Sequence, residues 1–406
     1  MEKIKKFIKS VGPGFIIASV MLGPGSITVA SRIGSEHGFA FLWVIVMAAI
    51  AMVVYTSMGA RFGVTHKESI LQSVTNTYGK WFAVVIGIAS FLSASSFQFG
   101  NNLGIGIALR EITGINETVW PLIFTPLAIL LVFWAKKLYK VLEKMMMVIV
   151  MVMIIAFVTN LFFVQPNFVA IVKGFMSVSF KWEHFDIIAA MVGTTFALHC
   201  AMYQAYLVQD KKWELEQLKE SLKDTYMGIF MLALISVLLI ITSAAALYPL
   251  GIVVNSAGDM AQQLESLFGS FAKIIFSIGL LSAAFSSLMV NSVMGGGLLA
   301  DGLGLGRRMN EKWPKIFTTV ILVLGMVVAV FFRGDAIYAL IMAQAASILG
   351  VPLIGIGLLM LLNNKKVMGE YRNTIIQNIL AVLGFILISV MVWYMYNKLI
   401  NFVGQV

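Results

Sequence analysis

The chain has 406 residues, of which 60% are hydrophobic and only 12% are charged, and its mean hydropathy is +0.92. Soluble domains carry about 25% charged residues, so this composition excludes a soluble protein and predicts an all-α protein that crosses the membrane several times. The single cysteine, Cys200, excludes an intrachain disulfide and a thiolate zinc site, and the net charge of +10 would suit nucleic acid only if gathered on one soluble surface.

Eleven apolar stretches approach or exceed the roughly 20 residues that cross a hydrocarbon core of about 30 Å. If the N-terminus is cytoplasmic, 22 of the 29 Lys and Arg residues fall in cytoplasmic segments and seven in extracytoplasmic ones. Because basic residues accumulate on the cytoplasmic side, we expect an inner (plasma) membrane protein with its N-terminus inside and its C-terminus outside. The charge therefore marks topology, and the bilayer, not nucleic acid, is the expected partner. The expected spans are 12–32, 39–60, 81–109, 119–135, 145–164, 186–208, 226–248, 270–300, 316–332, 336–362 and 374–397.

The first span is interrupted near its middle by Gly23, Pro24 and Gly25. Glycine destabilises a helix and proline removes a backbone donor, so the helix is expected to break there. Backbone groups freed in hydrocarbon are tolerated only where they are buried in protein or line a cavity. Broken helices near the bilayer midplane are where secondary transporters hold their cargo. The first candidate binding site is therefore at Gly23 and the neighbouring Ser26.

Two later spans carry polar residues. Span 3 contains Gln98 and Asn101, which suit either contacts between helices or a transport path. Span 6 contains Gly193, Thr194 and His199, the last being the only histidine within a span. Since transporters built from inverted repeats have a second broken helix one repeat later, we expect span 6 to break at Gly193, facing the first break. His199 either packs against a polar neighbour or acts as a pH-sensitive gate.

Short motifs occur in a fixed order over most of the chain. Through these motifs the chain resembles the Nramp divalent-metal transporters, which have the LeuT fold. The motifs are 12–15 (GPGF), 23–26 (GPGS), 38–43 (GFAFLW), 61–65 (RFGVT), 193–199 (GTTFALH), 286–302, Gln344, 349–353 (LGVPL) and 363–369 (NNKKVMG).

The resemblance implies eleven transmembrane helices arranged as a 5+5 inverted repeat with broken helices 1 and 6. Spans 1–5 would form the first repeat in residues 1–165, and spans 6–10 the second in residues 166–362. Residues 363–406 would add span 11.

The ligand positions depart from the family pattern. Gly23 stands where the family has a metal-binding aspartate, Ser26 where it has an asparagine, and Ala197 where it has a methionine. His199 and Gln344 are retained. The scaffold is therefore expected to persist without its usual ligand set.

The family's span-3 carboxylates, which are associated with proton transfer, appear here as Gln98 and Asn101. None of the 19 acidic residues falls in the middle of a span. A bare dication in a low-dielectric cavity needs anionic partners, because its desolvation exceeds the nominal cost of about 20 kcal/mol for a monovalent ion. Transport of a dehydrated transition metal with a proton is therefore not expected.

Three hypotheses remain. In the first, a site lined by Gly23, Ser26, Thr194, Ala197 and Gln344 passes a divalent cation, hydrated Mg²⁺ before Mn²⁺, with oxygens of Ser26, Thr194 and Gln344 as its ligands. In the second, the same scaffold carries a small neutral or anionic solute, attracted by the positive ends of half-helices. In the third, the protein is a membrane sensor that transports nothing.

An enzyme is not expected, since the sequence offers no nucleophile–base pair and no cluster of metal ligands. For the same reason no cofactor is expected. The partners are the cargo and the lipid bilayer, and nothing in the sequence specifies an oligomer, so a monomer is favoured.

Overall fold

The computed structural model describes residues 12–134, 151, 152, 154–177, 182–332 and 334–403, and the regular elements in these ranges are helices. The order begins with α2 (Pro13–Met21), α3 (Pro24–His37), α4 (Leu42–Thr65), α5 (Ile70–Tyr78), α6 (Lys80–Thr113), α7 (Trp120–Phe133), the helix Ile154–Val164 and α9 (Phe168–Met176). It continues with α10 (Phe185–Thr195), α11 (Leu198–Asp210), α12 (Leu218–Ala246), α13 (Ala257–Gln262), α14 (Glu265–Phe268) and α15 (Ala272–Gly302). It ends with α16 (Lys312–Phe331), α17 (Ala336–Ala346), α18 (Val351–Asn363), α19 (Lys365–Met368) and α20 (Ile375–Val403).

The prediction of an all-α, multi-pass membrane protein is confirmed. Eight helical segments of the described chain are long and apolar enough to cross a membrane, and two bent helix pairs bring the total to as many as ten. The expected number of eleven membrane spans stays a prediction. The helix α7 falls short of a full span, because its 14 residues cover only about 21 Å at 1.5 Å per residue. Residues 145–150 and 153 of the fifth span lie outside the described ranges.

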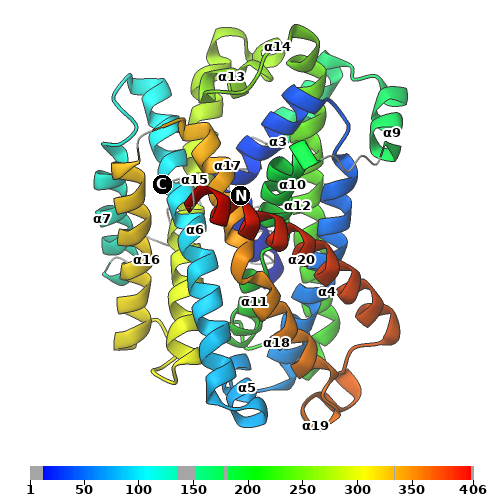
Figure 1. The fold of residues 1–406 in the computed structure, drawn as a ribbon, viewed down its shortest axis with the longest axis vertical. Coiled ribbons are helices and arrows are strands. Elements are labelled where there is room, and N and C mark those ends of the chain that lie inside the picture. Colours follow the sequence, from blue (N-terminus) through cyan, green and yellow to red (C-terminus); the bar gives the residue numbers. More distant parts are fainter. Residues whose placement is uncertain (1–11, 135–150, 153, 178–181, 333, 404–406) are drawn as a thin grey trace, which may run out of the picture.

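The two longest helices that build the bundle are α6 and α15, which lie side by side (Figure 1). The helix α16 packs against both of them, and α12 packs against both α2 and α3. The broken first span is thus held between long, continuous helices.

The first span is broken where the sequence predicts it. The helix α2 ends at Met21, Gly23 is extended at φ −85° and ψ −177°, and Pro24 is the first residue of α3. Proline suits that position because its missing N–H would have no helical partner there. The two halves are bent by 58° relative to each other.

The second break lies at Phe196 and Ala197, so the expected break at Gly193 is wrong in position. Phe196 has φ −119° and ψ 58°, and Ala197 has φ −88° and ψ 91°, which interrupts the helix between α10 and α11. Gly193 is a regular residue of α10. Its role is close packing, because a Cβ there would lie 2.3 Å from the main-chain oxygen of Gln344.

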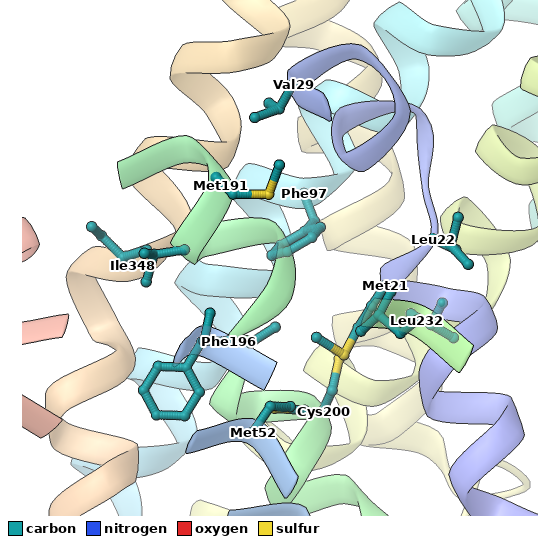
Figure 2. Close-up of a cluster of buried hydrophobic side chains, with 14 of the residues drawn as sticks. Met21, Leu22, Val29, Met52, Phe97, Met191, Phe196, Cys200, Leu232 and Ile348 are labelled. Atoms are coloured by element: carbon teal, nitrogen blue, oxygen red, sulfur yellow. The ribbon is translucent and has the colours of Figure 1, made fainter. Parts of the chain in front are cut away.

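The two broken spans cross in opposite directions. The first half of one, α2, packs against the second half of the other, α11, and α3 packs against α10. The breaks therefore lie at the same level of the bundle. Apolar side chains surround them, among them Met21 and Leu22 at the end of α2, Met191 in α10 and Phe196 (Figure 2). This arrangement suits an inverted repeat, whereas the boundaries at 165 and 362 stay predictions.

Candidate functional site

The carbonyl groups at the end of α2 are capped by hydroxyl groups. The Ser26 hydroxyl donates a short hydrogen bond across the break to the Met21 carbonyl, and the Ser287 hydroxyl donates to the Val20 carbonyl at 2.8 Å. These bonds satisfy backbone oxygens that the break has freed. Ser26 therefore has a structural partner for its hydroxyl hydrogen, and only the lone pairs of its oxygen are open to a ligand.

The space beside Gly23 is bordered by two oxygen atoms. A Cβ on Gly23 would lie 3.1 Å from Ser287 Oγ and 3.2 Å from Asn101 Oδ1. The glycine thus lets both oxygens approach the main chain of the break more closely than a side chain would allow. This is the position at which the family resemblance expects an aspartate.

The orientation of the Asn101 amide follows from its neighbours. Gln98 Nε2 donates to the Leu288 carbonyl at 2.7 Å, and since that carbonyl can only accept, Gln98 Oε1 must face the other way. Asn101 Nδ2 donates to this Oε1 at 2.8 Å. Asn101 Oδ1 is therefore presented toward Gly23, where it is buried and has no hydrogen-bond partner. We refer to Leu288, Gln98 and Asn101 as the amide relay.

A second amide oxygen without a partner belongs to Gln344 in α17. A Cβ at Gly25 would lie 2.2 Å from its Cδ, and one at Gly100 would lie 2.6 Å from its Nε2. Glycines of α3, α6 and α10 thus close around this one residue. Gln344 is 1% exposed, and its Oε1 is buried without a hydrogen bond.

The predicted site residues of span 6 make local contacts. The Thr194 hydroxyl donates to the Met191 carbonyl at 2.9 Å within α10, and Ala197 is a buried residue that precedes α11. Gln344 contacts the first break through Gly25 and α10 through Gly193. The hydroxyl groups of Ser26 and Thr194 each donate to a main-chain carbonyl of their own span.

His199 lies fully buried in a hydrogen-bonded chain. Its Nε2 is 2.9 Å from Asn291 Oδ1, and Asn291 Nδ2 donates to the Ala94 carbonyl at 2.9 Å. Asn291 Oδ1 must therefore accept, which places a proton on His199 Nε2. His199 Nδ1 is 3.2 Å from Ser93 Oγ, and that hydroxyl donates to the Ser347 carbonyl at 2.8 Å.

The chain around His199 joins the amide relay, because Asn291 Nδ2 also lies 3.3 Å from Gln98 Oε1. Asn291 and Ser287, both on α15, are site residues that the sequence does not distinguish. Their only sequence signal is polarity within an apolar span, which contacts between helices also produce. Among the described residues no group of three or more His, Cys, Asp or Glu could hold a metal ion.

A protein-family model described as natural resistance-associated macrophage protein-like matches residues 14–397. A relative named divalent metal cation transporter MntH, from Caldanaerobacter subterraneus subsp. tengcongensis, is 25% identical over 388 residues, covering 94% of this chain and 91% of its own. The MntH of Bacillus subtilis is 23% identical over 384 residues, covering 92% and 89%.

Solved structures with the same fold include a manganese transporter of Eremococcus coleocola bound to an aromatic bis-isothiourea compound. It has a TM-score of 0.75 at 16% identity and covers 97% of this chain and 87% of its own. The nucleobase-cation-symport-1 transporter Mhp1 has a TM-score of 0.59 at 15% identity, covering 95% and 92%. At these identities the likeness concerns the fold, which is the LeuT type expected from the sequence.

Proposed function

From the premise that the chain belongs to the Nramp family and is a multi-pass membrane protein of LeuT-type fold, we propose that it transports a divalent cation by alternating access. Its relatives are named divalent metal cation transporters, and a protein of the same fold is named a manganese transporter. We propose hydrated Mg²⁺ as the first cargo and Mn²⁺ as the second.

The observation that carries this proposal is that two buried amide oxygens beside the first break, Asn101 Oδ1 and Gln344 Oε1, accept no hydrogen bond. A third such oxygen, Gln204 Oε1, belongs to α11, where the same amide donates to Thr225 Oγ1 of α12. A buried acceptor without a partner costs about 1–3 kcal/mol. A cation would coordinate these oxygens directly, or the water around it would donate hydrogen bonds to them. An anion would bring further acceptors against these oxygens, whereas the N-termini of α3 and α11, which begin at the two breaks, favour negative charge.

A hydrated ion suits the available oxygen ligands better than a bare ion does. The oxygens near the first break belong to Ser26, Ser287, Asn101 and Gln344, and all of them are neutral. Neutral oxygens do not offset the desolvation of a bare dication, whereas Mg²⁺ keeps several of its waters when bound. With Ala197 in place of a sulfur ligand, softer metals gain no preference.

Asn101→Leu is expected to weaken cation binding about tenfold or more, because it removes one of the two unpartnered amide oxygens beside the first break. The measurement is uptake of Mg²⁺, Mn²⁺, Ca²⁺ and small organic solutes into proteoliposomes. The matched control is Asn102→Leu. Asn102 is equally buried but bonds the Gln98 carbonyl and the Thr125 hydroxyl, on the side of α7.

The control variant should lose stability and keep its cation affinity. Equal loss of affinity in both variants would show that Asn101 acts through packing alone. Uptake of an organic solute or anion, with no cation bound, would favour the alternative cargo. A protein that moves none of the panel would favour the sensor hypothesis.

Cation uptake is expected to leave the internal pH of the vesicles unchanged. Gln98 and Asn101 do not titrate near neutral pH, so the path that the family resemblance assigns to protons lacks its carboxylates. A pH-sensitive dye enclosed with the cation indicator gives both signals in one experiment. Acidification that tracks uptake would refute this prediction and would assign the proton to His199, the candidate gate.

A further inference from the structure

A large apolar cavity opens on the side of the bundle, away from the two breaks. Its volume is about 970 Å³, and it lies between α6, α16, α17 and the start of α18. We call this cavity the lateral slot. Short side chains form much of its inner wall, including those of Ser93 and Ser96 on α6 and Ala343 and Ala346 on α17.

The lateral slot is elongated along the membrane-spanning direction. Its lining extends along α6 from Val85 to Phe99, which is about 21 Å at 1.5 Å per residue. It extends a similar distance along α17 and α18, from Tyr338 to Leu353. The two helices lie one above the other in Figure 1. A hydrocarbon core is about 30 Å thick, so the slot spans most of it.

The mouth of the lateral slot faces hydrocarbon. Leu92, Leu324 and Val328 line it and are 58%, 44% and 47% exposed, and all three belong to helices long and apolar enough to cross a membrane. No aqueous solute reaches this side of a helix in a bilayer. What surrounds the mouth is therefore the acyl chains of lipids.

One end of the lateral slot has polar groups suited to the membrane interface. Tyr338 is near the start of α17, and its hydroxyl lies 3.2 Å from Lys398 Nζ. Tyrosine is enriched where hydrocarbon meets headgroups. Lys398 also forms an ion pair with Asp186, so together these side chains offer a headgroup polar partners of both signs. The distribution of basic residues predicts that this end is extracytoplasmic.

We propose that the lateral slot binds one phospholipid, with an acyl chain extended along α6 and the headgroup at Tyr338. The bound phospholipid would contact residues that adjoin the candidate transport site. Ser93 lines the slot and contacts His199, while Ala343 directly precedes Gln344. The proposal holds whichever cargo the protein carries.

The test is native mass spectrometry of the full chain, purified from vesicles of phosphatidylethanolamine and phosphatidylglycerol. The detergent concentration is raised until loosely bound lipid is removed. The wild type should retain one phospholipid. Ala346→Phe and Ser96→Phe, which fill the slot from opposite walls, should each retain none. Val382→Phe, on an exposed face of α20, is the matched control and should retain it.

A wild type that retains no lipid, or slot-filling variants that retain as much as the control, would overturn the proposal. Should both filling variants fail to fold, photo-crosslinking on the wild type decides. A phosphatidylcholine with a diazirine on its acyl chain should label Ser93 or Ala343, which are buried from the general lipid surface. Labelling confined to exposed residues such as Val382 would contradict the proposal.

Discussion

Gly23→Leu is expected to abolish cation uptake while the protein remains folded. A Cβ at this position already meets Ser287 Oγ at 3.1 Å and Asn101 Oδ1 at 3.2 Å, so a leucine side chain would displace these two oxygens from the break. The backbone at Gly23 is extended, at φ −85°, which any residue can adopt. The loss would therefore come from blocking the site and not from backbone strain.

The measurement is initial uptake rate in proteoliposomes, together with the thermal unfolding temperature. Gly23→Ala should reduce uptake only in part, because it adds a single carbon in tight contact. Gly297→Ala is the matched control, since its Cβ would meet nothing nearer than 3.5 Å. It should transport like the wild type. Undiminished uptake by Gly23→Leu would place the site elsewhere in the protein.

The second large effect is expected from restoring the family's ligands with Gly23→Asp, Ser26→Asn and Ala197→Met in one variant. The carboxylate adds the charge that a bare dication needs, and sulfur favours softer metals. Affinity for Mn²⁺ and Cd²⁺ should rise tenfold or more, which is about 1.4 kcal/mol. The wild type should bind Mg²⁺ and Mn²⁺ with similar affinity, and its affinity for Cd²⁺ should be no higher.

Calorimetry on the wild type and the triple variant measures these affinities. The new carboxylate would face Asn101 Oδ1, another acceptor, so the metal-free variant should unfold at a lower temperature than the wild type and recover when Mn²⁺ is added. Strong binding of Cd²⁺ by the wild type would show that its ligands lie elsewhere. No gain in the triple variant would show that the cavity has lost the family geometry.

The positions of the two breaks show where sequence reasoning succeeds and where it stops. Gly23 and Pro24 break the first span by local chemistry, since they remove a side chain and a backbone donor whatever surrounds them. Phe196 and Ala197 carry no such signal, because both residues are compatible with a helix. The sequence pattern therefore predicts the second break at Gly193, which instead allows α17 to approach α10 closely.

The sequence alone determined the membrane class, the family resemblance, the first break and the loss of the family's carboxylates, because each depends on composition or on residue type at one position. Only the tertiary structure decided which polar atoms are free to meet a cargo. Asn101 Oδ1 points to the first break because the Leu288 carbonyl, 187 positions away along the chain, orients the Gln98 amide. Gln344 is enclosed by glycines from three other helices. Side-chain orientation in hydrocarbon is set by hydrogen-bond partners on neighbouring helices, and sequence spacing within one helix does not encode them.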